Sequence, residues 1–122
     1  MVLDLDETLV HSSFKPIENP NIILPVEIDG SICNIYILVR PGVAQFLKKM
    51  HKHYELVVFT ASLSKYADPL VDILDPEKMC SYKLFREHCT FVNNSFVKDL
   101  TRLGRCMKDV IILDNSPIAY MF

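Results

Sequence analysis

Two aspartates, one residue apart, follow the first apolar run of the chain. In "VLDLDETLV", Asp4 and Asp6 lie within and just after the run from Val2 to Leu5. Alternate residues of an extended chain point to the same side, so both carboxylates enter one small space, where like charges repel. We therefore predict an oxygen-ligand site for Mg²⁺, with Asp4 free to attack phosphorus and Asp6 placed to carry a proton. Capping of a helix is the alternative, but it explains only one carboxylate.

Polar side chains also follow two other apolar runs. The run "LVVFTAS" ends in Thr60 and Ser62, and "VIILDNS" ends in Asp114 and Asn115. Ligands of an open parallel sheet bind outside the carboxyl ends of its strands, so these groups should converge with the aspartate pair. Asn115 would then offer Mg²⁺ a neutral oxygen, and Thr60 would donate to a phosphoryl oxygen. Alternatively, Thr60 caps a helix and Asp114-Asn115 forms a turn.

One lysine could complete such a site. Lys98 stands between strand candidates, just before a predicted helical turn over 98–103 that Gly104 ends. A lone lysine is either a solvated surface charge or a cation that reaches the phosphate. We expect the second, because Mg²⁺ and a lysine together would stabilise Asp4 as an anion.

The elements that must hold these groups alternate between the two secondary structures. Apolar runs predict strands at 2–5, 56–59, 82–85, 89–92 and 110–113. Helices are expected from Pro41, with Val43, Phe46 and Leu47 on one face, and from Asp68-Pro69. This order predicts an α/β fold, a Rossmann-like parallel sheet with helices on both faces.

An insertion at 14–39 interrupts the alternation. Apolar residues alternate with polar ones over 24–28 and again over 33–39, and Asp29-Gly30 between them is a strong turn signal. The segment is therefore predicted to form a β-hairpin.

The apolar side chains of this insertion have two possible roles. Val26, Ile28 and Ile35 share one face of the hairpin, which either packs on the core or lines a binding surface. Phe14 lies in a polar, proline-flanked loop, so we expect it to be exposed for contact. Arg86 follows an apolar strand, and its guanidinium suits a phosphate or a peptide carbonyl.

The bulk composition narrows the class of protein. The 122 residues fit one domain, and a net charge of −2 argues against a broad nucleic-acid-binding surface. No apolar run reaches the ~20 residues that span a membrane, and no signal peptide is visible. The four cysteines lack metal-binding spacing, so free buried thiols are expected. An apolar run begins directly at Met1, and the chain stops at Phe122 inside what is predicted to be a further element, so we expect a chain cut at both ends.

Several specific motifs in the sequence resemble those of a known protein family. The string "DLDETLV" resembles the first motif of the haloacid dehalogenase superfamily, and "FTAS", "VKDL" and "ILDNSP" resemble its later motifs. The longer strings "DLDETLVHSSFKP", "PVEIDG", "FTASLSKYADP", "LFREHC" and "VKDLTRLGR" resemble the small phosphatases that act on the C-terminal domain of RNA polymerase II. The resemblance covers essentially the whole chain.

This resemblance implies roles for the strand-end residues. They are Asp4 as nucleophile and Mg²⁺ ligand, Asp6 as general acid and base with its carbonyl on the metal, Asn115 as third ligand, Thr60 and Lys98 on the phosphoryl oxygens, and Thr8 and Asp114 in support. The family's domain begins earlier and continues past Phe122, so residues 1–122 are expected to be a phosphatase domain truncated at both ends.

The resemblance also implies a substrate. Residues 14–39 match a family insertion whose apolar pocket takes a substrate proline. The matching positions are Phe14, Val26, Ile28, Ile35 and Leu63 for the pocket, and Tyr66 and Arg86 for other substrate contacts. Phosphoserine in RNA polymerase II repeats or in related nuclear phosphoproteins is the implied substrate. A nuclear monomer, without direct contact to nucleic acid or membrane, is expected.

Two other functions are alternatives to a phosphatase. A phosphorylated receiver domain has similar length and acidic strand ends, but its middle strand ends in Asp, whereas the strand at 56–59 ends in Thr60. A truncated phosphopeptide-binding protein with weak catalysis would keep every motif residue. A cooperative thermal transition would favour the enzyme over that alternative.

Overall fold

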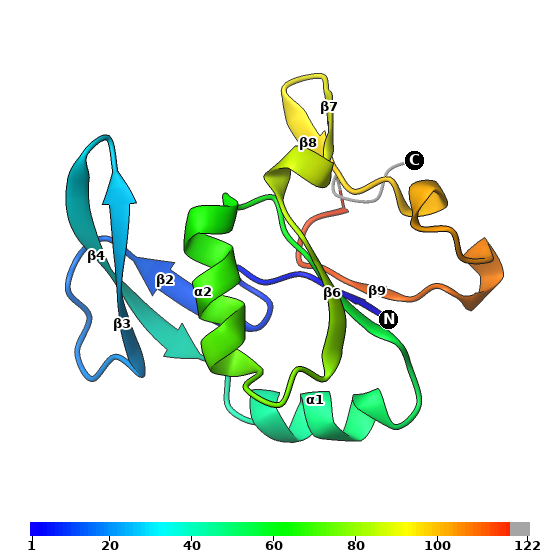
Figure 1. Ribbon diagram of the computed structural model, residues 1–122, viewed down its shortest axis with the longest axis horizontal. Helices are drawn as coiled ribbons and strands as arrows, with labels where there is room; N and C mark the ends of the chain where they lie inside the picture. The colour runs from blue at the N-terminus through cyan, green and yellow to red at the C-terminus, as the bar shows by residue number, and fades with distance from the viewer. Residues whose placement is uncertain (118–122) are drawn as a thin grey trace.

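A four-stranded parallel sheet forms the centre of the computed structural model, which describes residues 1–117 (Figure 1). Its strands are β1 (Val2–Leu3), β5 (Leu56–Phe59), β6 (Cys80–Leu84) and β9 (Ile112–Leu113). They lie in the order β6-β5-β1-β9, with Val2 paired to Val57 on one side and to Ile112 on the other. The predicted α/β class with a parallel sheet is confirmed.

The strand order explains where the helices lie. The chain steps from β1 to β5 to β6 in one direction, through α1 (Val43–His51) and α2 (Ser64–Leu74). Right-handed crossovers in the same direction leave their helices on one face of a sheet. Both helices accordingly share a core with Leu3, Leu5 and Val58, in which Val43, Leu47, Ala67, Leu70 and Val71 are buried.

The return to β9 reverses direction, so its connection borders the other face of the sheet. It contains the 3-10 helices η1 (Arg86–His88), η2 (Leu100–Leu103) and η3 (Met107–Asp109). Residues of η2 and η3 border a groove of about 540 Å³, whose other side includes Val2 and Val57.

The start of α2 differs from the prediction. The Asp68-Pro69 signal placed the helix start there, but α2 begins at Ser64 and contains Pro69. Proline lacks only the N–H that would bond the carbonyl of Lys65, whereas the amides of Tyr66 and Ala67 both donate to the Leu63 carbonyl, at 3.1 and 3.0 Å. The buried stripe of the helix already starts at Ala67, so packing holds this first turn ahead of the proline.

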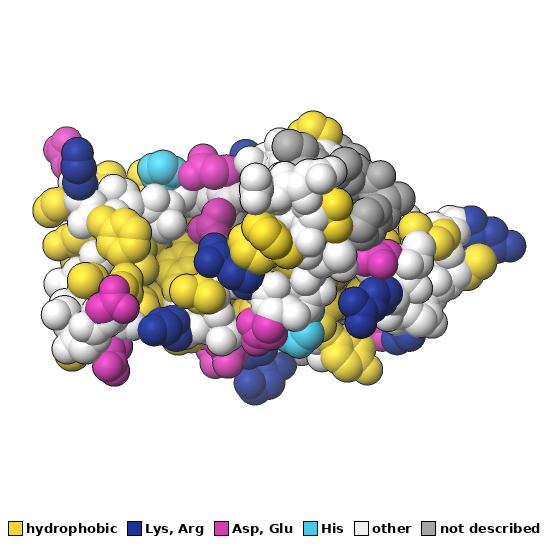
Figure 2. All heavy atoms as spheres, turned by 90° about the horizontal axis from the view of Figure 1, so that it is seen from above, with side chains coloured by type: hydrophobic (Ala, Val, Ile, Leu, Met, Phe, Trp, Pro, Cys, Tyr) yellow, Lys and Arg dark blue, Asp and Glu magenta, His cyan; other side chains and the backbone are white. Residues whose placement is uncertain are grey.

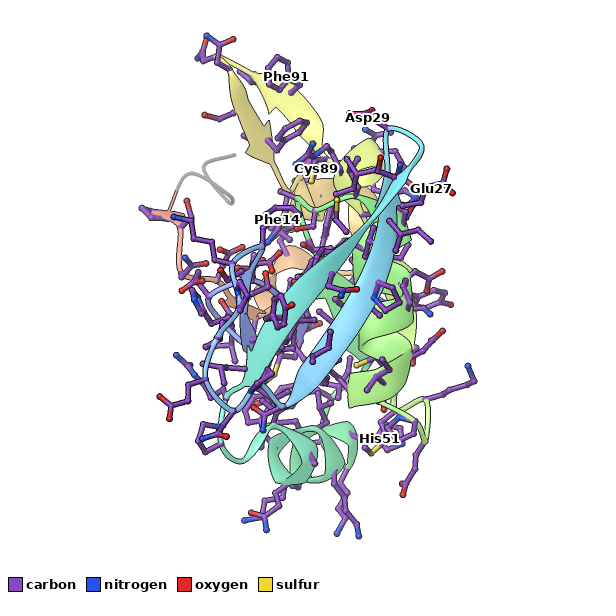
Figure 3. All side chains as sticks on the ribbon, turned by 90° about the vertical axis from the view of Figure 1, so that its left-hand side faces the viewer. Phe14, Glu27, Asp29, His51, Cys89 and Phe91 are labelled. Carbon is purple, nitrogen blue, oxygen red and sulfur yellow. The ribbon has the colours of Figure 1, made fainter. Side chains whose placement is uncertain are left out.

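The predicted hairpin is present within a three-stranded antiparallel sheet. Its strands β2 (Val10–Ser13), β3 (Ile22–Ile28) and β4 (Ser31–Val39) lie in the order β2-β4-β3. Asp29 and Gly30 both adopt positive φ, 52° and 80°, as a tight hairpin turn requires. This sheet projects to one side, beside α2 (Figures 1 and 3). The pattern did not predict β2, which is short and mostly polar.

A second hairpin carries the chain to Lys98. It consists of β7 (Thr90–Val92) and β8 (Ser95–Val97), joined through Asn93 and Asn94 at φ of 51° and 62°. The strand prediction at 89–92 is close to β7, whereas β8 was not predicted. Val97 at its end is fully buried, and the following Lys98 is also buried, at 2% exposure.

The last strand is shorter and more exposed than its sequence suggests. The strand predicted over 110–113 is present but shorter, because only Ile112–Leu113 pairs with β1, and Ile111 and Leu113 are 41% and 38% exposed. Within residues 1–117 this strand lies at the edge of the sheet, so it has a single partner. The element expected to start near Phe122 lies outside the described residues.

The cysteines and the lengths of the helices complete the description of the fold. The cysteines are free, but Cys106 is exposed and the other three are half-buried, so the expected burial is wrong. Among the described residues, no helix is both long and apolar enough to cross a membrane.

Candidate active site

The ends of β1 and β9 lie side by side. The Asp4 amide donates to the Leu113 carbonyl at 2.9 Å, which places Asp114 next to Asp4. The chain leaves β1 toward β5 on one side and returns to β9 on the other, so a topological switch point lies between these strands. Open sheets bind ligands at such points, and the predicted convergence of the strand ends is found here.

Lys98 joins the two strand ends. Its Nζ donates to Asp4 Oδ1 at 2.9 Å and also to Asp114 Oδ2. The three side chains are 2%, 10% and 2% exposed, for Lys98, Asp4 and Asp114 in turn. The alternative of a solvated surface lysine is therefore wrong. One cation faces two carboxylates, so the cluster keeps a net negative charge where a substrate phosphate would have to approach.

Asp4 is held from several sides. Thr8 Oγ1 donates to Asp4 Oδ2 at 3.1 Å, while Lys98 occupies Oδ1. Burial raises the pKa of the Asp4 carboxyl above its ordinary value, and the hydrogen bond and charge of Lys98 oppose this rise. Additional positive charge would act in the same direction as Lys98 and favour the carboxylate anion.

The donor set at these strand ends fits a magnesium ion. Asp4 offers a carboxylate with unused acceptor capacity, and Asn115 follows Asp114 with an exposed amide. In the part of the chain that the structure describes, no three Asp, Glu, His or Cys side chains gather into a metal-binding group. Mg²⁺ does not require one, since it binds proteins through one or two carboxylates, waters and substrate phosphates.

Thr60 lies buried at the end of β5, with 1% of its surface exposed. Its Oγ1 accepts from the Ser62 amide at 3.1 Å, within a local turn. The residue that precedes α2 is Leu63, which makes no side-chain cap, so the alternative of Thr60 as the helix cap is wrong. Among the described residues this hydroxyl accepts a hydrogen bond but donates none, so its hydrogen remains available for an acceptor in the crevice.

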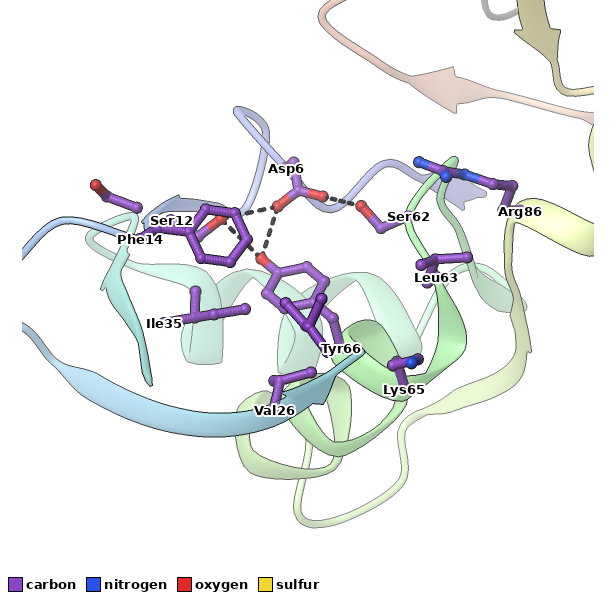
Figure 4. Close-up of a pocket in the computed structure, with 12 residues that line it drawn as sticks. Asp6, Ser12, Phe14, Val26, Ile35, Ser62, Leu63, Lys65, Tyr66 and Arg86 are labelled. Atoms are coloured by element: carbon purple, nitrogen blue, oxygen red, sulfur yellow. Dashed lines mark hydrogen bonds between the residues drawn. The ribbon is translucent and has the colours of Figure 1, made fainter. Parts of the chain in front are cut away.

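Asp6 belongs to a different network from Asp4. Ser62 Oγ donates to Asp6 Oδ2 at 2.5 Å, and Tyr66 Oη donates to Oδ1 at 2.7 Å (Figure 4). Burial raises the pKa of the Tyr66 phenol, and the neighbouring Asp6 carboxylate adds to the rise, so Tyr66 is a hydrogen-bond donor at neutral pH. Glu7 has φ of 61°, so the chain leaves the extended conformation directly after Asp6. The two carboxylates therefore have separate partners.

A cavity of about 310 Å³ opens beside Asp6, between the three-stranded sheet and α2. It brings together the positions that the resemblance assigned to substrate, which are Phe14, Val26, Ile28, Ile35, Leu63, Tyr66 and Arg86. Apolar surface gathers over this end of the molecule, next to basic and acidic groups (Figure 2). Val26 and Ile35 are 4% and 5% exposed, so the hairpin face packs on the core while it also lines the cavity.

The cavity has an aromatic rim and a basic rim. Phe14 is 66% exposed on one side, as predicted for its loop. On the other side, Arg86 Nε donates to the Ala61 carbonyl at 2.7 Å, and its guanidinium lies 4.8 Å from the centre of the Phe96 ring. These contacts fix the arginine without any carboxylate partner among them, so its charge remains available to an anionic or carbonyl ligand.

Sequence reasoning did not assign some residues that line the cavity. They are Ser12, Ser13, Ser62 and Lys65. The position of Ser62 after an apolar strand indicated that it could belong to the site. Nothing in the sequence indicated this for the two serines of β2. Their placement depends on the pairing of β2 with β4, which the polar sequence of β2 does not predict.

The chain matches known proteins along its whole length. A family model described as NLI interacting factor-like phosphatase matches residues 1–122. A probable C-terminal domain small phosphatase of Dictyostelium discoideum is 57% identical, over all of this chain and 40% of its own length. The human carboxy-terminal domain RNA polymerase II polypeptide A small phosphatase 1 is 56% identical, over all of this chain and 47% of its own length. The chain spans less than half of these relatives.

Solved structures share the fold. The fission yeast RNA polymerase II CTD phosphatase Fcp1, bound to beryllium fluoride, superposes with a TM-score of 0.77 at 25% identity, over 98% of this chain and 37% of that one. A second structure, of Fcp1 as an essential RNA polymerase II CTD phosphatase, gives a TM-score of 0.76 at 27% identity, over 91% and 36% of the two chains.

Proposed function

The chain belongs to the NLI interacting factor-like phosphatase family, and on that premise we propose that it is a Mg²⁺-dependent protein-serine/threonine phosphatase that works through an aspartyl-phosphate. The observation that supports this most is the buried cluster of Asp4, Lys98 and Asp114 at the switch point of the sheet. Asp6, two residues after Asp4, lines a cavity of about 310 Å³.

In the first proposed step, a carboxylate oxygen of Asp4 attacks the substrate phosphorus. The bond between phosphorus and the seryl oxygen breaks, and Asp6 gives its proton to that leaving oxygen. The products are the free serine and a phosphoryl group on Asp4. Thr60 and Lys98 hold phosphoryl oxygens, Thr60 through its available hydroxyl hydrogen and Lys98 through its charge.

In the second step, Asp6 takes a proton from a water molecule. The water oxygen bonds to phosphorus, the bond to Asp4 breaks, and inorganic phosphate leaves. Asp4, the Asp6 carbonyl and Asn115 would hold Mg²⁺, which supplies positive charge to the reacting phosphoryl group. Thr8 and Asp114 support the site through their bonds to Asp4 and Lys98.

We propose that the substrate is phosphoserine in RNA polymerase II C-terminal repeats or in related nuclear phosphoproteins, which places the protein in the nucleus. Residues 14–39 form the substrate-contacting insertion of the domain, and its cavity would receive an apolar side chain such as proline next to the phosphoserine. The names of the relatives and solved structures, which refer to RNA polymerase II, support this choice of substrate.

The first test is hydrolysis of a small aryl phosphate by this 122-residue chain, with and without Mg²⁺. Turnover should require Mg²⁺ and should disappear when a chelator removes the ion. A chain that melts cooperatively and binds a phosphoserine peptide, yet shows no turnover with Mg²⁺, would overturn the enzyme in favour of a phosphopeptide-binding protein.

A variant of the exposed rim tests the peptide cavity. Phe14→Ala should lower kcat/KM for a proline-containing phosphoserine peptide by about tenfold and leave hydrolysis of a small aryl phosphate nearly unchanged, because only the peptide reaches Phe14. Phe91→Ala is the matched control, since Phe91 is 61% exposed and does not line the cavity. An equal loss on both substrates would count against Phe14 as a peptide contact.

A further inference from the structure

Hydroxyl groups from three separate elements surround the Asp6 carboxyl group (Figure 4). Ser62 Oγ, from the loop between β5 and α2, lies 2.5 Å from Oδ2. Tyr66 Oη, from α2, lies 2.7 Å from Oδ1, and Ser12 Oγ, from β2, lies 3.4 Å from the same oxygen. Ser12 and Tyr66 also bond each other at 3.0 Å. Both oxygens of one carboxyl group are thus held.

We propose that Ser62 and Tyr66 are positioning residues that orient the Asp6 carboxyl group toward the leaving oxygen, and that the enzyme needs them to release basic leaving groups such as a seryl alkoxide. This inference rests on the proposed function, because it refines the role of Asp6 within the same site. Neither residue reacts with the substrate phosphorus in this role.

The geometry of the hydrogen bonds indicates that they orient the Asp6 carboxyl group and do not simply bury it. A carboxyl group turns freely about its last bond unless both oxygens are held, and here Ser62 and Tyr66 hold different oxygens. Each support is itself anchored. The Ser62 amide donates to Thr60 Oγ1 at 3.1 Å, and its carbonyl accepts from the Arg86 amide at 3.0 Å. Tyr66 lies on α2 and packs against the core.

The chemistry of hydroxyl groups suits both halves of the reaction. Serine and tyrosine hydroxyls can donate or accept a hydrogen bond. The same network can therefore hold Asp6 before and after it gives up its proton. Asp4 does not belong to this network, since its side-chain partners are Lys98 and Thr8. Loss of a hydroxyl beside Asp6 should leave the nucleophile in place.

The basicity of the leaving group distinguishes the positioning of Asp6 from other roles that Ser62 and Tyr66 could have. A nitrophenolate departs readily without a proton, whereas a more basic oxide needs one from Asp6. If Asp6 is misoriented, the rate of hydrolysis should therefore fall more for substrates with more basic leaving groups. The parameter kcat/KM reports this step, because it covers all events up to departure of the leaving group.

The experiment compares kcat/KM across substituted phenyl phosphates of graded leaving-group basicity, together with a small alkyl phosphate. None of these substrates fills the peptide cavity, so contacts of Tyr66 with a peptide do not enter. Ser62→Ala and Tyr66→Phe should lower kcat/KM by at most about threefold for nitrophenyl phosphate and by about 10–100-fold for the alkyl phosphate. Ser62→Thr, which keeps a hydroxyl, should restore most of the loss.

Matched controls remove a hydroxyl elsewhere. Ser81→Ala, at an exposed position of β6, and Tyr54→Phe, after α1, should follow the wild-type dependence on leaving group. A uniform loss across the series in Ser62→Ala and Tyr66→Phe, or no loss, would overturn the positioning role while leaving the phosphatase in place. A wild-type chain that hydrolyses none of the substrates would overturn the proposed function, and this inference with it.

Discussion

Asp4→Asn is expected to abolish turnover, with a fall in kcat/KM of at least about 10³-fold on a small aryl phosphate. The amide nitrogen and oxygen are poor nucleophiles toward phosphorus, so no aspartyl-phosphate forms. The substitution keeps the size of the side chain, and Lys98 retains Asp114 as a partner. The folded state should therefore survive, which a cooperative thermal transition would show. Asp109→Asn, on exposed η3, is the control with the same chemical change.

Pre-steady-state kinetics distinguish Asp4 from Asp6. Asp6→Asn should also abolish steady turnover, but with nitrophenyl phosphate the first step needs little help from an acid. We expect a burst of nitrophenolate from Asp6→Asn, followed by slow release of phosphate, and no burst from Asp4→Asn. A burst from the Asp4 variant would assign the nucleophile to another residue and would contradict the mechanism.

The central sheet and its strand-end site were predictable because local and global signals agree there. The runs at 2–5 and 56–59 are rich in Val and Leu, and polar groups lie at the end of each. In a parallel sheet this order leaves those groups at one edge. The Asp29-Gly30 turn was predictable for a similar reason, since a tight hairpin turn requires positive φ at both positions.

Other features depend on contacts between distant segments, which a local pattern does not reveal. Strand β2 is defined by its pairing with β4, not by its own residues. The first turn of α2 forms against the signal of Pro69 because Ala67 is buried by tertiary packing. The Asp6 network joins residues up to 60 positions apart in the chain. Spacing along the chain predicted that Asp4 and Asp6 share one space, but it did not predict that each carboxylate has its own hydrogen-bond partners.

Lys98 shows how tertiary placement decides the energetic role of a residue. Two lysines of this chain each bridge a pair of carboxylates. Lys98 binds Asp4 and Asp114 with 2% of its side chain exposed, whereas Lys83 binds Asp68 and Asp72 with 29% exposed. The sequence singled out Lys98 and gave no role to Lys83, but it did not show how deeply either ion pair is buried. This difference in burial predicts that loss of the Lys98 ion pairs lowers the free energy of unfolding much more than loss of the Lys83 ion pairs.

Lys98→Met should lower the free energy of unfolding by about 3–5 kcal/mol, because it leaves two buried carboxylates without their cation. Methionine fills similar volume, so the loss reports charge rather than a cavity. Lys83→Met should cost much less, since water screens exposed ion pairs. Denaturant unfolding of both variants measures the contrast. Adding Asp114→Asn to Lys98→Met should recover part of the loss, because it removes one of the two unpaired charges. Equal effects of the two lysine substitutions would contradict the burial of the cluster at the switch point and the proposed role of Lys98 as the buried cation beside Asp4.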